Sequence, residues 1–90
     1  MNNDRRKAIK EISLRLDALR DMIDAIKDDI ETVRDEEREA LDNMPASLQE
    51  GEKGQAIDEA ANNIGNAYDE LDDVTNRLDE VIGYLSLATG

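Results

Sequence analysis

The 90-residue chain contains no cysteine, histidine, tryptophan or phenylalanine, and it has only one proline and two tyrosines. The lack of cysteine excludes disulfide cross-links and is compatible with a reducing, cytosolic compartment. The lack of histidine removes the commonest general base and the Glu-x-x-His pairs of di-iron centres. The three serines therefore have no histidine to activate them, and no glycine-rich phosphate-binding motif occurs. We expect a protein that is not an enzyme and that has no cofactor.

Long apolar runs are also missing. No stretch of about 18 uncharged apolar residues occurs, so no membrane-spanning helix is expected. Residues 1–19 carry basic side chains without the apolar stretch of a secretory signal. We expect a soluble, intracellular protein that does not enter a membrane.

The charge is strongly negative and unevenly distributed. The chain has 11 basic and 23 acidic residues, for a net charge of −12. Residues 1–20 hold six bases and three acids, a balance of +3, whereas residues 21–90 hold five bases and twenty acids, a balance of −15. Because nucleic acids are bound through basic surfaces, direct nucleic-acid binding by the body of the protein is disfavoured. A basic partner, or a small anion at the N-terminal end, suits this distribution.

Two segments show the spacing of long, coiled-coil-like helices. Steps of three and four residues separate the branched aliphatic residues of the first segment: Ile9, Ile12, Leu16, Leu19, Ile23, Ile26, Ile30 and Val33. The second segment repeats the pattern at Ile57, Ala60, Ile64, Ala67, Leu71, Val74, Leu78, Val81, Leu85 and Ala88. These are the a and d positions of a heptad repeat, with Ile9 and Ile57 both at a.

A turn between the segments is predicted by the stretch NMPASLQEGEKG at residues 43–54. Pro45 lacks an amide hydrogen and disfavours helical geometry at Met44, so the first helix is expected to end near Asn43. Gly51 is a plausible cap for a second helix beginning near Glu52. The sequence thus predicts one all-α domain over residues 1–90, with helices at about 4–43 and 52–88 and a turn at about 44–51. Their matched lengths favour a long antiparallel hairpin.

The second helix has a wider apolar stripe than a two-helix seam needs. The e positions beside a and d carry Ala61, Tyr68, Thr75 and Ile82. We expect this flank to contact another subunit, so that hairpins assemble into a four-helix bundle as a homodimer or higher oligomer. In the antiparallel pairing, residues whose numbers add to about 97 lie side by side.

This pairing predicts a basic end and an acidic middle. The basic end consists of Arg5, Arg6, Lys7 and Lys10. Cations are disfavoured at a helix N-terminus, so these four bases suggest a function such as holding a phosphate or nucleotide. The alternative is that the tip of the helix is frayed and solvated.

The acidic middle consists of Asp28, Asp29, Glu31, Asp69, Glu70, Asp72 and Asp73. Carboxylates bind Mg²⁺ or Ca²⁺. Because these acidic residues fall mostly on outer helix positions, a solvated face is favoured over a metal site.

The spacing of Glu36, Glu39, Glu70 and Asp73 matches the E-x-x-E and E-x-x-D pairs of all-helical nucleotide pyrophosphatases. Glu39 and Asp73 would point away from the core, which argues against a shared metal site.

The heptad pattern assigns no function to two further features, Gly65 and Leu48. Gly65 lies inside the second helix, where it serves a close contact with another subunit, a kink or a ligand, or has no consequence. Leu48 is expected to fold over Leu41 and Met44 to close the end of the hairpin.

Residues 34–80 resemble a group of small helical proteins encoded by phages and prophages. The likeness is carried by Asp42-Asn43-Met44-Pro45, Ser47-Leu48-Gln49 and Glu52-Lys53-Gly54. The group has no assigned activity, so the resemblance implies a genomic setting and a place in the cytoplasm of a host cell. It suggests a non-enzymatic oligomer that blocks or sequesters a host factor, which would be a defence protein or a nucleotide immune signal.

Two other functions are compatible with the sequence. One is an acidic DNA mimic that occupies a nucleic-acid-binding protein; it would use the negative charge of residues 21–90. The other is a purely structural helical bundle, for which mutations at either end would change no binding activity.

Overall fold

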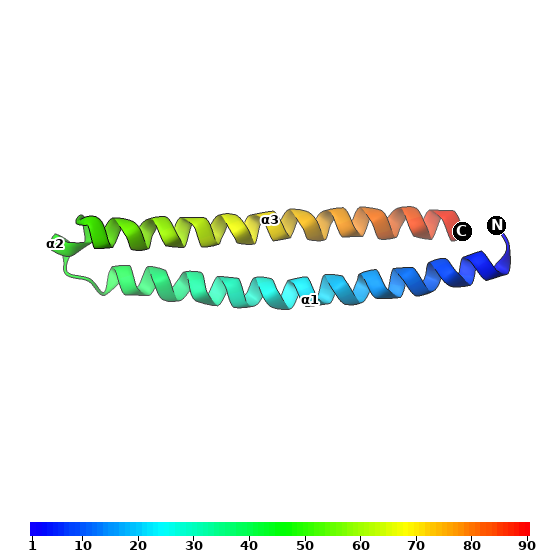
Figure 1. Ribbon diagram of the computed structural model, residues 1–90, viewed down its shortest axis with the longest axis horizontal. Coiled ribbons are helices and arrows are strands. Elements are labelled where there is room, and N and C mark those ends of the chain that lie inside the picture. Colours follow the sequence, from blue (N-terminus) through cyan, green and yellow to red (C-terminus); the bar gives the residue numbers. More distant parts are fainter.

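The computed structural model describes all residues, 1–90, as a long helical hairpin (Figure 1). It consists of α1 at Asn3–Asp42, the one-turn helix α2 at Ala46–Gln49 and α3 at Glu52–Thr89. The two long helices run antiparallel, and both chain termini lie at the same end (Figure 1). The Cα atoms extend over 69 × 15 × 13 Å. The predicted all-α hairpin is therefore confirmed.

The ends of α1 are held by asparagine residues. The side chain of Asn2 accepts a hydrogen bond of 2.9 Å from the backbone N–H of Arg5, which caps the first turn. No glycine or proline interrupts the 40 residues that follow. At the other end, Asn43 donates its backbone N–H to the carbonyl of Glu39. None of the three helices is long and apolar enough to cross a membrane.

The segment between the long helices contains more structure than the expected turn. Pro45 begins a short helical turn, because its carbonyl accepts hydrogen bonds from the backbone of Leu48 and Gln49. Gly51 is extended, with φ −79° and ψ 179°, and precedes α3 without a side-chain cap. Leu48 is about half exposed, so it does not close the end of the hairpin as expected.

Gln49 closes the end of α1 instead of Leu48. Its side-chain amide donates hydrogen bonds of 3.0 Å to the carbonyls of Leu41 and Met44. Leu41 lies in the last turn of α1, where its carbonyl also accepts a hydrogen bond from the backbone N–H of Met44, and Met44 lies just beyond the helix. This side chain therefore joins the end of α1 to the segment that follows. Gly54 lies directly beneath: a Cβ there would be 2.1 Å from the carbonyl oxygen of Gln49. The contact between α2 and α3 thus requires glycine for steric reasons.

The hairpin leaves most of its surface open. Only four of the 90 residues are buried, and of these only the small residue Ala61, at 1% exposed, is almost completely enclosed. The cross-helix pairs Arg20–Asp79 and Lys27–Asp72 have residue numbers that add to 99, two more than the expected 97. Two helices side by side cannot surround a large side chain, so the hairpin has a seam rather than a core.

Candidate interaction surfaces

The seam between α1 and α3 is built from the a and e positions of both helices. In α1 the e positions carry Ser13, Arg20, Lys27, Arg34 and Leu41, which are all less exposed than the neighbouring d positions. In α3 the e positions carry Ala61, Tyr68, Thr75 and Ile82, which the sequence interpretation placed at a contact with another subunit. In the structure these four residues lie towards α1, within the same hairpin.

The contacts of these four residues explain that difference. Ala61 is buried, and the ring of Tyr68 lies 5.0 Å from the ammonium of Lys27 and 5.7 Å from the guanidinium carbon of Arg34. Thr75 turns its hydroxyl back onto the carbonyl of its own helix at Leu71. The long basic side chains of α1 can reach across to tyrosine and aspartate, so the e flank is used inside the hairpin.

Two ion pairs cross the seam at an interval of one heptad. Arg20 donates to Asp79 and Lys27 donates to Asp72, each at 2.7 Å. The hydrogen bond to Asp79 raises the pKa of Arg20, and the hydrogen bond to Asp72 raises the pKa of Lys27. These pairs hold the charged forms and orient α3 along α1. Sequence reasoning missed them, although bases at e in one helix opposite acids in the other were a detectable signal.

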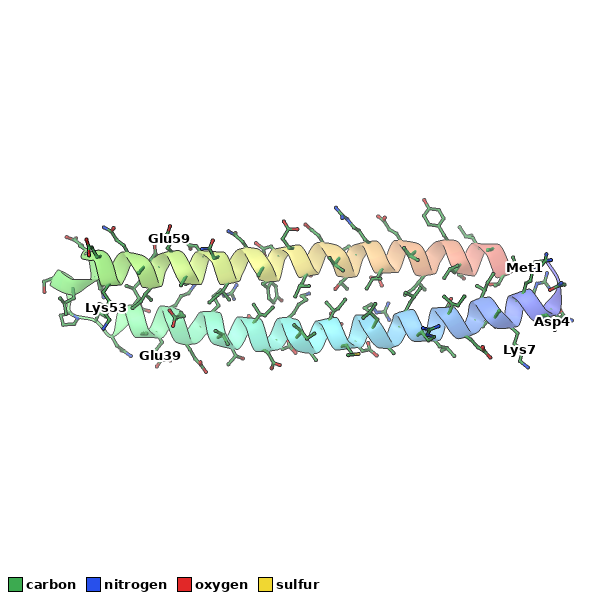
Figure 2. All side chains as sticks on the ribbon, viewed as in Figure 1. Met1, Asp4, Lys7, Glu39, Lys53 and Glu59 are labelled. Atoms are coloured by element: carbon green, nitrogen blue, oxygen red, sulfur yellow. The ribbon has the colours of Figure 1, made fainter.

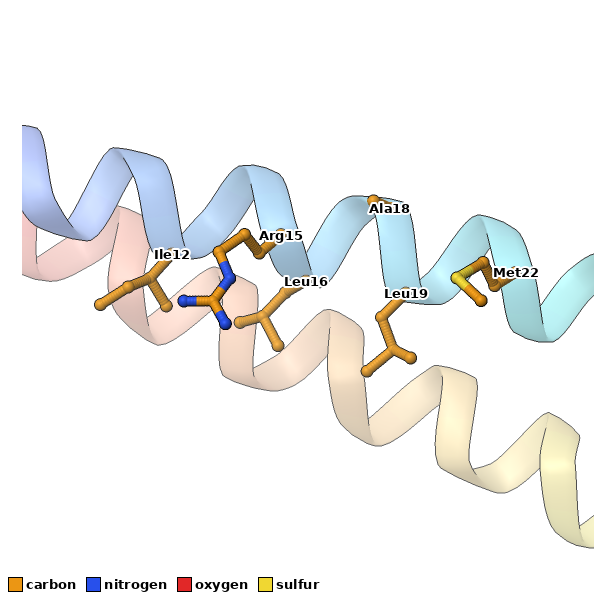
Figure 3. Close-up of a pocket in the computed structure, with 6 residues that line it drawn as sticks. All are labelled: Ile12, Arg15, Leu16, Ala18, Leu19 and Met22. Carbon is orange, nitrogen blue, oxygen red and sulfur yellow. The ribbon is translucent and has the colours of Figure 1, made fainter.

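The d positions form an exposed apolar face on the side of the hairpin next to the seam. The apolar face is defined as the exposed d residues, each between 39% and 48% exposed: Ile12, Leu19, Ile26, Val33, Val74 and Val81. Shallow hollows interrupt it. One lies along α1, where Ile12, Leu16 and Leu19 extend in the same direction (Figure 3). Another lies between the helices, lined by Ile26, Ile30, Val33, Ile64, Ala67 and Asp29.

The four predicted anion-binding residues lie at the end of the rod that carries both termini. Arg5, Arg6, Lys7 and Lys10 are exposed, and none of them takes part in an ion pair. Lys7 extends away from α3 (Figure 2). Lys10 borders a groove with Ser13 and Leu14 of α1 and Ile82, Ser86 and Thr89 of α3. The four side chains therefore share one end of the rod without contacting one another.

The same end exposes two large side chains outside the apolar face. Tyr84 and Leu87 are 74% and 79% exposed, more than any other large hydrophobic residue of the chain. They line a shallow hollow with Glu80 and Gly83 on α3. We call terminal pole the set Arg5, Arg6, Lys7, Lys10, Tyr84 and Leu87. It combines unpaired cations with an exposed aromatic ring, and its arginines and tyrosine are residue types that protein interfaces favour.

The acidic residues do not converge. Of the predicted acidic middle, Asp72 pairs with Lys27, and no group of three or more acidic side chains is placed to hold a metal ion. Glu39 lies on the outer side of α1 (Figure 2). Gly65 faces α1, where a Cβ would lie 3.7 Å from the Cδ of Arg34, an ordinary contact distance.

Comparison of the chain with protein-family models, with curated proteins and with solved structures finds no match. The surfaces described above therefore carry the functional argument.

Proposed function

We propose that this chain is a non-enzymatic interaction protein that works as an oligomer of hairpins and that binds and blocks or sequesters a host factor. The terminal pole is the contact surface. The host factor is anionic: an acidic patch of a defence protein, or a nucleotide immune signal. The genomic setting follows from the resemblance to phage and prophage proteins, and the place of action is the cytoplasm of the host cell.

One observation supports the proposal most strongly. The terminal pole carries four unpaired bases and the two most exposed large apolar side chains, in a protein whose net charge is −12. An exposed tyrosine can stack on a nucleobase or pack on a protein surface, while cations at the same end of the rod hold phosphates or carboxylates. Two long helices place these groups at the tip of a rod, where a large partner has access to them.

The proposal is tested by capture from host cells with matched charge variants. Tagged protein is purified from host cells with active defence and nucleotide-signalling systems, and bound molecules are identified by native mass spectrometry. The test variant is Arg5→Ala/Arg6→Ala/Lys7→Ala. The control is Arg38→Ala/Lys53→Ala/Arg77→Ala, which removes the same charge from three other exposed, unpaired bases. We expect the native chain and the control to carry the same partner and the test variant to lose it.

The mass of the bound molecule, measured as the increase over the mass of the protein alone, identifies the class of partner. A small-molecule mass indicates a nucleotide, whereas a protein mass indicates a defence protein. If the test variant retains the partner, the terminal pole is not the contact surface. Release of a protein partner by duplex DNA, with no effect of the pole variant, would favour the acidic DNA mimic instead.

A further inference from the structure

We infer that the apolar face is covered by a second copy of the same chain, packed so that the inter-helix loops of the two copies lie at opposite ends of a four-helix bundle. The inference deepens the oligomeric part of the proposed function and rests on it. It names the partner of one surface.

The face has the form of a helix-packing surface. Its residues follow both helices at heptad spacing. One hollow lies beside Leu16 on α1, and another lies beside Ile30 between the two helices. Side chains of a facing helix insert into such hollows in helix bundles. Because two parallel stripes lie in one plane, the matching partner is another pair of helices. A second hairpin has that form and the same heptad spacing.

The exposed area is also that of half a dimer. The chain exposes 6692 Å², whereas a compact monomer of 10.1 kDa is expected to expose about 5,300 Å², so the excess is about 1,400 Å². If each copy buried that excess, the interface would total about 2,800 Å², which is within the range of obligate homodimers. The hairpin alone encloses no large apolar side chain, and dimerisation would supply the missing core.

Symmetry permits two ways to stack the hairpins face to face. With the two-fold axis along the rod, both loops lie at one end, and α1 of each copy packs on α3 of the other. With the axis across the rod, the loops lie at opposite ends, so α1 packs on α1 and α3 on α3. The two arrangements bury the same face and differ in which charged segments become neighbours.

Charge favours the arrangement with loops at opposite ends. Residues 1–20 have a balance of +3, while residues 25–42 have eight acids and three bases, a balance of −5. Residues 52–70 have five acids and one base, a balance of −4. Loops at one end would set −5 beside −4, with the +3 segment beside residues 71–90, which have four acids and one base. Loops at opposite ends set +3 beside −5 twice along α1.

That arrangement still brings acidic segments together along α3. Residues 52–70 of one copy, at −4, would lie beside residues 71–90 of the other, at −3. This repulsion is weaker than that between −5 and −4, and the attraction along α1 exceeds it. Like-charge contacts suppress the wrong orientation in helical assemblies. The gradient of charge along α1 thus selects between two packings that the apolar residues do not distinguish.

Spin labels test the orientation, because the chain has no cysteine that would interfere. Ser47→Cys places a label in the loop, and Asn3→Cys places one near the terminal end. In dimers with both copies labelled at residue 47, we expect a separation approaching the 69 Å length of the rod. In mixed dimers labelled at residue 47 in one copy and residue 3 in the other, we expect about 20 Å, the width of two helices. A short distance between the two loop labels would overturn the inference.

Mass and a pair of aspartate variants test the surface. By light scattering, the native chain should have twice its 10.1 kDa mass. Ile26→Asp places a charge in the apolar face and should give a monomer, while Ala25→Asp adds the same charge at an exposed position outside that face and should leave a dimer. A native monomer, a different subunit number, or an Ile26→Asp dimer would overturn the inference.

The two proposals fail in different ways. A dimer with opposed loops that captures no host factor would support this inference and reject the proposed function. A monomer that captures a partner through the terminal pole would overturn this inference while supporting host-factor binding.

Discussion

Lys27 of α1 donates a hydrogen bond of 2.7 Å to Asp72 of α3, and its ammonium lies 5.0 Å from the centre of the Tyr68 ring. Apolar contacts alone would tolerate a slip of one heptad, since the a residues repeat. A slip in one direction would set Lys27 opposite Gly65, and a slip in the other would set Arg20 opposite Ser86, so either slip would lose one of the two ion pairs across the seam. The ion pair therefore helps to select one register along two nearly uniform helices.

Replacement of Lys27 should destabilise the hairpin. Lys27→Ala removes the hydrogen bond to Asp72, the contact with the Tyr68 ring and the buried stem of the side chain. We expect the midpoint of thermal unfolding to fall by several degrees, as measured by circular dichroism. Arg38→Ala, which removes an exposed and unpaired base, should leave the midpoint unchanged. An equal effect of both changes would mean that the seam contacts contribute nothing specific.

The same pair predicts a loss of stability at alkaline pH. The hydrogen bond to Asp72 raises the pKa of Lys27 above its usual 10.5. Because the folded protein holds this proton more tightly, the pair's contribution is fully present below pH 10.5 and is lost as the pH rises through the higher folded pKa. Denaturant unfolding from pH 9 to pH 12 checks this in a Tyr68→Phe background. The free energy of unfolding should fall less over this pH range in Tyr68→Phe/Lys27→Ala than in Tyr68→Phe alone.

Two glycines of α3 should respond to alanine in opposite directions. At Gly54 a Cβ would lie 2.1 Å from the carbonyl oxygen of Gln49, so Gly54→Ala must displace α2. Overpacking of this kind costs about 1–3 kcal/mol in the free energy of unfolding. At Gly83 nothing lies within 4 Å, and Gly83→Ala should stabilise the helix by about 1 kcal/mol. Chemical denaturation of both variants measures the difference.

Gly65 gives a separate test of the seam. A Cβ there would meet only the Cδ of Arg34, at 3.7 Å. Gly65→Ala should therefore be tolerated and should raise the free energy of unfolding by up to about 1 kcal/mol through helix propensity. A loss of stability would reveal a close contact at Gly65 that the isolated hairpin lacks, such as one with another subunit.

The side chain of Gln49 should contribute to the closure of α1. Gln49→Ala removes two hydrogen bonds to the carbonyls of Leu41 and Met44. These carbonyls regain water in part, so we expect a loss of about 1 kcal/mol in the free energy of unfolding. Hydrogen exchange should show faster opening of the last turn of α1. Ser47→Ala, at an exposed position in the same segment, is the matched control and should have no such effect.

The sequence predicted the hairpin because its signals are local. Heptad spacing depends only on residues within two turns of a helix, and Pro45 disfavours helical geometry at Met44 by its own covalent structure. The exposed bases Arg5, Arg6, Lys7 and Lys10 were found by the same local reading. The role of Gln49 was not, because it depends on how α2 folds back onto the carbonyls of α1.

The repeat along the chain determined that both helices carry apolar a and d residues and that the e positions are mostly basic in α1 and mostly apolar in α3. Only the tertiary structure decided which flank each helix uses within the hairpin. Arg20, Lys27 and Arg34 reach across the seam to Asp79, Asp72 and Tyr68, and these contacts rotate the e positions inward. The d positions are thereby left exposed. Heptad spacing cannot make this choice, because the rotation of a helix about its axis depends on long side chains that meet residues distant in the chain.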